Sequence, residues 1–433
     1  MAVTGDVPTG THIVRRSAAP AGARVDVDIC VLGAGISGVS AALEAARLGR
    51  RVALVDGLPA LGGQAVNAIV GTFCGLFSNG SHGYQVTHGI ADEILRDLGA
   101  QGVLHYRHGP VTTVVMYDEV ALSRWVEEAV RQAGITVLLG AMLQHVDRDG
   151  GRIRAVDLLT RYGSLRVAAT GFVDATGDAA LAWEAGFDCR EPDVPSYGTQ
   201  MVVLENIDEA HMPPREHVPE RARAKREEYG LARTDGFAFV FPGRATALVN
   251  LTHIETPLEP VAASRIALEG KAQADRVVAF LRGEFPAAFG KARVRSYGFP
   301  GIRQTRWIVG RQQLSVDDVR AGTRFPDAIA RTGWPIELHD RVEGYIWQPF
   351  PEDHLHWVPL GSLIPREADN LLAVGRCIDA DNAALSSVRV MGPCIAMGAA
   401  AAHALDLAGA GSVQQIDFAA LRQRLHDNLD RTD

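Results

Sequence analysis

The chain has 433 residues, of which 47% are hydrophobic and 22% are charged. This composition is typical of a globular protein with two or three domains, and it excludes a coiled coil, a collagen and a largely disordered chain. The formal net charge of −8 disfavours non-specific binding to nucleic acid and a role at a membrane surface.

The cysteines and the N-terminus indicate the compartment. The five cysteines include no Cys-x-x-Cys pair, which predicts neither a zinc ribbon nor a disulfide framework and is typical of a reducing cytoplasm. We interpret residues 1–24 as a loose arm, because Arg15-Arg16 is followed by no apolar segment of a secretion signal. No apolar run approaches the ~20 residues of a membrane span, and no cluster has metal-ligand spacing. We therefore expect a cytoplasmic protein without a metal.

The strongest motif follows the first predicted strand, residues 27–32. Gly33-Ala34-Gly35-Ile36-Ser37-Gly38 is a G-x-G-x-x-G turn, and a helix is predicted over residues 36–48. A second strand over residues 51–55 ends at Asp56. This order is typical of a βαβ unit that binds a dinucleotide, and the alternative is a purely structural turn.

Each residue of this motif has a physical role. Gly33 allows the tight turn, Gly35 lets a pyrophosphate approach the backbone, and Gly38 lets helix and strand pack closely. The helix N-terminus offers unpaired N–H groups to the phosphates, and Asp56 is placed to accept from a ribose hydroxyl. The residues of the turn that we predict to bind the cofactor are Gly33, Gly35, Ile36, Ser37 and Gly38.

Later segments resemble flavoproteins and favour FAD over NAD. Gly62-Gly63-Gln64 resembles the loop that passes along FAD in the extended flavoprotein motif. Ala175-Thr176-Gly177-Asp178 follows a strand and resembles the return of the chain to the FAD-binding sheet. Gly375-Arg376 ends a late strand, and Gly392-Pro393 opens a helix of small residues. The resemblance implies that these residues other than Thr176 bind FAD and that the last helix points its N-terminus at the flavin.

Residues 301–310, Gly-Ile-Arg-Gln-Thr-Arg-Trp-Ile-Val-Gly, extend the resemblance to a G-I-R-E-S-R-R-I-x-G segment. Residues 325–330, 334–339 and 386–390 also match. Over about residues 27–409 the chain resembles the bacterial FAD-dependent oxidoreductases related to the fumarate reductase and succinate dehydrogenase flavoproteins. The resemblance implies an α/β fold: a Rossmann-like FAD-binding domain of the glutathione-reductase type with a β-meander insert, plus a second α+β substrate domain.

The remaining elements can be placed around this frame. Periodicity predicts a helix over 118–133, a strand over 135–139 and an antiparallel meander over 141–173. In the second domain it predicts strands over 198–205, 236–242 and 245–254, a solvated helix over 221–229 and an amphipathic helix over 259–283. We assign residues 25–61, 111–184 and 365–433 to the FAD-binding domain, and residues 62–110 and 185–364 to the substrate or cap domain.

The function that this reading predicts is hydride transfer between a small polar substrate, including one that bears a carboxylate, and flavin N5. A flavin monooxygenase or halogenase-like enzyme is one alternative, and an ene-type reductase acting on an unsaturated acid is another. No second G-x-G-x-x-G between strand and helix is present for NAD(P)H, and the W-x-W-x-I-P segment of flavin halogenases is absent. The sequence does not determine the electron acceptor or the oligomeric state, and a homodimer is one of the states that it allows.

Four residues are the catalytic candidates. The resemblance places Arg303 and Arg306 near the flavin, where two guanidinium groups suit an anionic substrate. Histidine is the default base for the substrate proton, with His356 as first choice and His253 as second. For each of these residues a structural role is the alternative. Cys74 is either a buried core cysteine, a covalent flavin link or a nucleophile.

Overall fold

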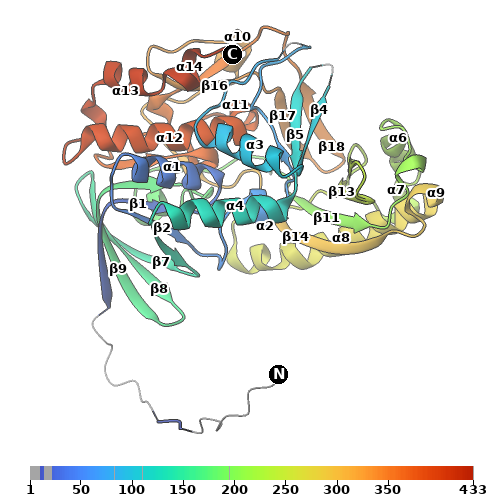
Figure 1. The fold of residues 1–433 in the computed structure, drawn as a ribbon, viewed down its shortest axis with the longest axis horizontal. Helices are drawn as coiled ribbons and strands as arrows, with labels where there is room; N and C mark the ends of the chain where they lie inside the picture. Colours follow the sequence, from blue (N-terminus) through green and yellow to red (C-terminus); the bar gives the residue numbers. More distant parts are fainter. Residues whose placement is uncertain (1–9, 14–21, 82, 110, 195, 433) are drawn as a thin grey trace.

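The computed structural model describes residues 10–13, 22–81, 83–109, 111–194 and 196–432 (Figure 1). Most of the N-terminal arm expected over residues 1–24, with Arg15-Arg16, lies outside the described residues.

A parallel sheet forms the centre of the fold. Its strands are β1 (Ala23–Leu32), β2 (Val52–Asp56), β6 (Thr136–Leu139), β9 (Gly163–Asp174) and β20 (Leu371–Ala373). Strand β1 pairs with β2 on one side and with β9 on the other, β6 pairs with β2, and β20 pairs with the end of β9. Where both faces are covered the strands are apolar, as in residues 29–32 of β1, 52–55 of β2, 171–173 of β9 and 371–373 of β20. The predicted parallel βαβ unit is confirmed.

The two faces of this sheet carry different layers. Ile29 and Val31 of β1 point to α1 (Ile36–Arg47), α4 (Glu119–Gln132) and α12 (Met391–Ala408). Cys30 and Leu32 point to the opposite face, which is covered by the predicted meander. The meander consists of β7 (Met142–Asp149) and β8 (Arg152–Thr160), in which β8 pairs antiparallel with β7 on one side and with β9 on the other. The alternation of side chains along β1 therefore decides which layer each residue meets.

A second unit lies to the right in Figure 1 and has its own hydrophobic core. Its antiparallel sheet has the order β12-β13-β11-β14, formed by β12 (Phe237–Phe241), β13 (Thr246–Asn250), β11 (Thr199–Glu205) and β14 (Arg293–Gly301). Helix α8 (Pro260–Glu284) packs on it and starts where Glu259 accepts from two backbone N–H groups. The helix predicted over 221–229 is two short helices, α6 (His217–Ala224) and α7 (Arg226–Tyr229), which ends at Gly230 in the left-handed conformation.

Short elements complete the chain. They are α2 (Gly63–Asn67), β3 (Thr72–Phe73), α3 (Ile90–Ala100), β4 (Leu104–His108), β5 (Thr113–Tyr117), α5 (Ala180–Glu184), β10 (Cys189–Arg190), α9 (Pro286–Phe289), β15 (Trp307–Ile308), α10 (Val316–Ala321), β16 (Ala328–Thr332), β17 (Ile336–Arg341), β18 (Gly344–Gln348), β19 (His356–Pro359), α11 (Asn382–Val388), α13 (Phe418–Arg424) and α14 (His426–Asp430). Helix α3 and strands β16 and β17 share the core of the parallel sheet. The domain boundaries stay a prediction, and this packing ties both parts closely together.

Helix α12 joins the layers through small residues. A Cβ at Gly398 would collide with the carbonyl oxygen of Ser37, so the two helices approach as closely as their backbones allow. Among the described residues, α12 is the one helix whose length and composition would let it cross a membrane. Most of it is buried inside the protein, as in the core helix of a globular fold.

Candidate functional site

The glycine-rich turn lies at the carboxyl end of β1. Gly33 has φ +101°, and a Cβ there would collide with the carbonyl oxygen of Ala175. A Cβ at Gly38 would collide with the carbonyl oxygen of Gly33, so neither position accepts a side chain. Gly35 is different: a Cβ would meet no atom of the described residues within 4 Å. None of the described side chains caps α1 at Gly35, so the helix start faces open space.

Two further predicted segments border this space. Asp56 Oδ2 accepts from the Ala34 N–H (2.6 Å) and Oδ1 from the Leu58 N–H (2.8 Å), which fixes the carboxylate beside the turn with further lone pairs available. Gly62 and Gly63 both have positive φ, and a Cβ at Gly63 would lie 2.5 Å from the Gly35 Cα. Only glycine allows this loop to lie directly against the turn.

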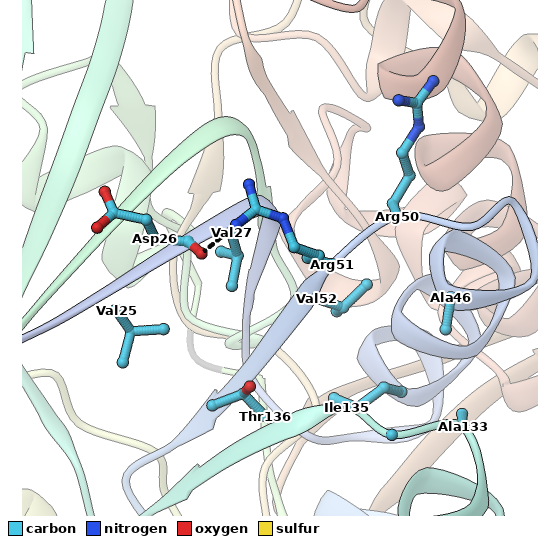
Figure 2. Close-up of a pocket in the computed structure, with 11 residues that line it drawn as sticks. Val25, Asp26, Val27, Ala46, Arg50, Arg51, Val52, Ala133, Ile135 and Thr136 are labelled. Carbon is cyan, nitrogen blue, oxygen red and sulfur yellow. Dashed lines mark hydrogen bonds between the residues drawn. The ribbon is translucent and has the colours of Figure 1, made fainter.

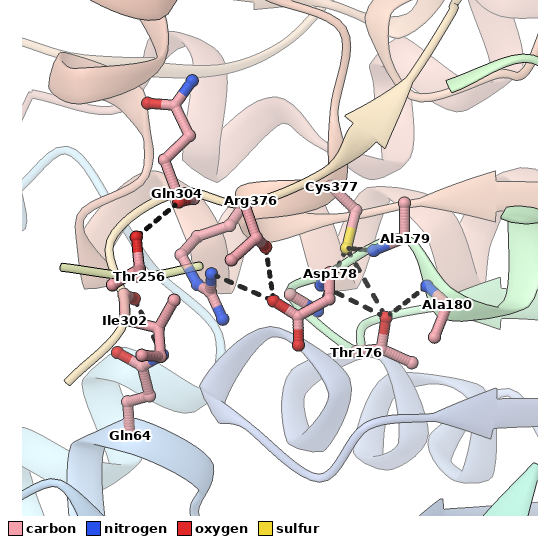
Figure 3. A network of polar contacts seen from close by, with 12 residues as sticks. Gln64, Thr176, Asp178, Ala179, Ala180, Thr256, Ile302, Gln304, Arg376 and Cys377 are labelled. Carbon is pink, nitrogen blue, oxygen red and sulfur yellow. Dashed lines mark hydrogen bonds and ion pairs between the residues drawn. The ribbon is translucent and has the colours of Figure 1, made fainter. Parts of the chain in front are cut away.

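A polar network joins the Ala175–Asp178 turn to two later segments (Figure 3). Cys377 Sγ accepts from the Gly177 N–H at 3.1 Å, and the Arg376 and Asp178 charges lie 3.7 Å apart. Thr305 Oγ1 donates to Asp178 Oδ1 at 2.5 Å. Gln64 donates to the carbonyl oxygen of Ile302 at 2.8 Å, so the 301–310 segment is held against the same edge.

Unpartnered polar atoms at this edge indicate a missing ligand. Arg376 Nη1 is buried and has no hydrogen-bond partner among the described residues, and the same holds for both amide atoms of Gln304. Buried polar atoms without partners are costly, so such atoms are normally satisfied by a ligand or by water. The open space before Gly35, the acid Asp56 and these atoms together fit the phosphates and hydroxyls of FAD.

Gly375 and the start of α12 meet the other side of the turn. Gly375 has φ +67°, and a Cβ there would lie 2.9 Å from Ser37 Oγ and 3.7 Å from Cys394 Sγ. A Cβ at Gly392 would collide with the carbonyl oxygen of Gly75. The structure thus brings the helix starts of α1 and α12 together, as expected for the predicted FAD residues.

One detail of the α12 prediction needs correction. We expected unpaired N–H groups at its start to stabilise charge on the flavin. The Gly392 N–H donates instead to the carbonyl oxygen of Cys74 at 2.9 Å, and Pro393 has no N–H. What the helix can still offer is mainly its macrodipole and the positive charges around it.

Four partly exposed side chains gather near the start of α12. Arg303, Arg389 and Cys74 each keep some accessible surface. We infer that these side chains border a space that a ligand can enter. Glu337, with 25% of its side chain exposed, lies within electrostatic range of all three. We call these four residues the arginine cavity.

The electrostatics of the arginine cavity favour an anion. Burial lowers the pKa of Arg389 to about 10, and burial with Arg233 and Arg389 nearby lowers that of Arg303 well below its usual range. Arg303 Nη1 donates to the Tyr197 carbonyl oxygen at 2.7 Å, and Arg389 Nε has no partner among the described residues. An anionic ligand would relieve the cost of these buried positive charges.

Cys74 has little nucleophilic character in this setting. Burial raises the pKa of its thiol to about 12, with the Glu337 carboxylate acting in the same direction. The thiol is therefore protonated near neutral pH, which disfavours a nucleophilic role. In the part of the chain that the structure describes, no group of three or more His, Cys, Asp and Glu is placed to hold a metal ion.

His253 reaches the arginine cavity through two other residues. Its Nε2 lies 2.9 Å from His339 Nδ1, and His339 Nε2 lies 3.1 Å from Glu337 Oε1. The second nitrogen of His253 lies 3.0 Å from the carbonyl oxygen of Val342. Burial is the main cause that lowers the pKa of both histidines.

His356 has a structural environment. It is fully buried on β19, where its Nε2 lies 2.9 Å from Ser387 Oγ, which donates to the Trp334 carbonyl oxygen. Its Nδ1 lies 3.3 Å from His354 Nε2. Both ring nitrogens therefore have protein partners, and neither is free to take a proton from a substrate. The catalytic role stays a prediction, and this geometry disfavours it.

A pH-dependent stability should reveal this structural role. Burial lowers the pKa of His356 from 6.5 to about 3, so the unfolded chain binds a proton that the folded chain rejects. His356 therefore contributes fully to the free energy of unfolding above pH 6.5. This contribution decreases as the pH falls from 6.5 to about 3. We expect His356→Gln to have a lower melting temperature at pH 7 and a shallower loss of stability on acidification. Parallel melting curves for the two proteins between these pH values would contradict this.

Arg306 lies apart from Arg303. Its guanidinium group is 3.2 Å from Glu191 and lies over the Trp183 ring, 4.1 Å from the centroid. Residues 302–306 are not helical, so a spacing of three does not place the two arginines on one face. The expectation that both hold one anion is not supported, and Arg303 lies instead within electrostatic range of Arg389.

Two shallow hollows lie elsewhere. One of about 280 Å³ is lined by the amino ends of β1, β2 and β6, with Asp26, Arg50 and Arg51 around it (Figure 2). The other, of about 620 Å³, lies beside Lys291 in the second unit. Parallel sheets bind ligands at the carboxyl ends of their strands, so neither hollow is the candidate site.

Sequence reasoning did not select Glu337, His339 or Arg389. Glu337 and His339 are two apart on β17, and this alternation would have placed both on one face of a strand. Arg389 follows α11 shortly before α12, within the 386–390 segment that carries the family resemblance, but nothing in that segment distinguishes the arginine as a site residue. Their association depends on contacts between residues more than 50 positions apart, such as Arg389 with the Glu337 carbonyl oxygen at 3.2 Å.

Comparison with known families identifies the class of protein. The family described as FAD dependent oxidoreductase matches residues 28–425, which is nearly the whole chain. The chain belongs to this family, and it is a flavoenzyme that uses FAD as its cofactor. The coarser sequence predictions of an oxidoreductase, of FAD and of a mixed α/β fold with a parallel sheet are thereby confirmed.

Solved structures with similar folds are distant. A geranylgeranyl bacteriochlorophyll reductase-like protein from Thermoplasma acidophilum is 14% identical, with a TM-score of 0.48 over 94% of this chain and 85% of that chain. The p-nitrophenol 4-monooxygenase from Pseudomonas putida is 11% identical, with a TM-score of 0.46 over 94% and 83%. A flavin-dependent brominase is 13% identical, with a TM-score of 0.45 over 93% and 83%. Similarity at this level carries no argument about the reaction. A search of the curated proteins gave no match.

Proposed function

We propose that this protein is an FAD-dependent dehydrogenase or oxidase that transfers a hydride between a small, carboxylate-bearing polar substrate and flavin N5. The observation that carries the proposal is the arginine cavity, where Arg303 and Arg389 are both partly accessible and burial lowers the pKa of each guanidinium group. The finer relation to fumarate reductase and succinate dehydrogenase flavoproteins, and a glutathione-reductase type of FAD domain, belong to the same proposal.

The residues that would hold the cofactor lie along one edge. The Gly33–Gly38 turn would receive the pyrophosphate, Asp56 would accept from the ribose, and Arg376 would gain a partner for its buried Nη1. Bound FAD supplies two-electron redox chemistry, which no amino-acid side chain provides.

The protein's part in the reaction is to bind and orient the substrate. A guanidinium group forms paired, charge-assisted hydrogen bonds with a carboxylate, and in an enclosed cavity these bonds are strong. Arg303 and Arg389 would fix the carboxylate, and the walls of the cavity would exclude water. The substrate's reacting carbon would then be held in one orientation, which lowers the entropic part of the barrier.

Anaerobic reduction of the bound flavin tests the substrate class. We expect small 2-hydroxy or 2-amino carboxylates to bleach the flavin absorbance, and the matching uncharged alcohols or amines to fail. Bleaching by NAD(P)H alone would favour a monooxygenase or halogenase-like enzyme. Reoxidation of the reduced protein by an unsaturated acid would favour an ene-type reductase. Either of these results without bleaching by a carboxylate would overturn the dehydrogenase proposal.

The partners and location remain part of the proposal. We propose a small-molecule substrate, a cytoplasmic location, and no nucleic-acid or membrane partner; the electron acceptor and a homodimeric state are to be measured. Reoxidation rates with oxygen, a quinone or a carrier protein identify the acceptor, and sedimentation gives the oligomeric state.

A further inference from the structure

A chain of three side chains leads from the arginine cavity into the second unit. It starts at Glu337, whose Oε2 accepts from Trp334 Nε1 at 3.2 Å, and continues through His339 to His253. His339 and His253 are almost completely buried, whereas the Glu337 side chain is partly accessible. The accessible end of the chain therefore lies at the cavity.

The contacts of this chain require one more proton than its ordinary forms supply. The carbonyl oxygen of Val342 only accepts, so His253 Nδ1 must carry a hydrogen. One hydrogen lies between His253 and His339, and another lies between His339 and Glu337. Two neutral imidazole rings carry only two N–H hydrogens, and an ionised carboxylate carries none. The third hydrogen is therefore an additional proton, held on a ring or on the carboxyl group.

The charges around the chain restrict where this proton goes. The positive charges of Arg303, Arg233 and Arg389 repel a further positive charge on the His339 ring. Arg303 and Arg233 have the same effect on the His253 ring. Tyr345 stacks on His339 and Tyr197 stacks on His253. Asp235 pairs with Arg233 and reduces its effect, and Cys74 lies near Glu337 as a neutral thiol. The two rings are therefore poor sites for an additional positive charge.

We propose that Glu337 is the catalytic acid–base residue of this enzyme, and that His339 and His253 are positioning residues that share its proton. This inference rests on the proposed function for the identity of the substrate. In substrate oxidation the O–H or N–H bond breaks and its proton passes to the proton-poor chain at Glu337. The electron pair of that bond would form the C=O or C=N bond, and the C–H electron pair would go to the bound FAD, which would supply the two-electron oxidation. The observed contacts correspond to the chain after it has gained the proton.

The first test detects the proton in the FAD-loaded protein without a substrate. Nitrogen-15 NMR of labelled histidine counts the ring N–H groups, and infrared spectroscopy detects the C=O band of a protonated carboxyl group. Between about pH 5 and about pH 9 we expect either a third ring N–H or this band, lost in one step as the pH rises. Glu337→Gln should abolish that step. If neither signal occurs in the parent protein at any pH in this range, the inference is wrong.

The second test measures flavin reduction by a substrate at several pH values. We expect Glu337→Gln to slow reduction by about 100-fold or more and to remove one limb of the pH profile. His339→Gln should slow reduction and shift the limb, while the half-saturating substrate concentration stays unchanged. If His339 were merely structural, its replacement would change the stability of the protein without shifting this limb of the pH profile. His88→Gln is the matched control, because His88 is also a buried histidine and its Nδ1 lies 3.1 Å from a carboxylate oxygen of Asp92.

The two tests separate this inference from the proposed function. If the proton is found but no small carboxylate reduces the flavin, the proposed function fails and the proton chain stands. If a carboxylate reduces the flavin equally fast in folded Glu337→Gln, with the pH profile of the parent, the inference fails and the proposed function stands.

Discussion

Replacing Gly35 with valine is expected to give a protein that folds but no longer retains FAD. A Cβ at this position meets no atom of the described residues within 4 Å, and Gly35 has an ordinary φ of −70°. The fold therefore tolerates the side chain, whereas a pyrophosphate at the start of α1 does not. An intruding branched side chain costs about 1–3 kcal/mol, which weakens binding by about 5-fold to about 160-fold. The ratio of flavin to protein absorbance after purification measures this.

Two variants control this experiment. Gly99→Val places the same side chain on the exposed end of α3, away from the turn, and should stay yellow. Gly33→Ala should fail to fold properly, because its Cβ collides with the Ala175 carbonyl oxygen and its φ is positive. A folded Gly35→Val protein with one FAD per chain would show that the pyrophosphate lies elsewhere.

Replacing Arg303 with alanine is expected to weaken substrate binding far more than replacing Arg306. Arg303 borders the arginine cavity, and a hydrogen bond to a charged group contributes about 1.5–3 kcal/mol. The half-saturating substrate concentration for flavin reduction should rise by about 10-fold to 100-fold. Arg306 pairs with Glu191, whose side chain is 51% exposed, so the loss of this pair should have little effect on substrate binding.

Stopped-flow reduction of the yellow variants gives both quantities. Arg303→Lys is a useful third variant, because it keeps the charge but loses the planar fork and should recover only part of the affinity. Equal effects of the Arg303 and Arg306 replacements would mean that the substrate does not bind between Arg303 and Arg389.

Local sequence was sufficient for the FAD-binding half of the fold. The apolar runs at β1 and β2, the glycines between β1 and α1, and the acid at the end of β2 each respond to constraints within about 30 residues. A parallel strand buried on both faces must be apolar, and a turn without room for a Cβ must contain glycine. Such requirements leave a pattern that can be recognised without knowing the rest of the structure.

The catalytic candidates were harder to predict, because their roles depend on distant partners. His356 and His253 have similar local sequences on or beside strands, yet one contacts Ser387 and the other leads to Glu337. Arg303 and Arg306 share one motif, yet one lines the cavity and the other pairs with Glu191. The type of residue indicates what chemistry it can perform, but not which direction it faces in a non-helical segment.

The sequence by itself determined the cofactor class, the parallel sheet and the turn that would receive the phosphates. These features depend on backbone geometry, and backbone geometry restricts residue type locally. Only the tertiary structure decided which charges share a cavity and how many protons the Glu337–His339–His253 chain holds. The physical reason is that electrostatic interactions and hydrogen bonds act through space, between residues up to about 90 positions apart here, so no local pattern encodes them.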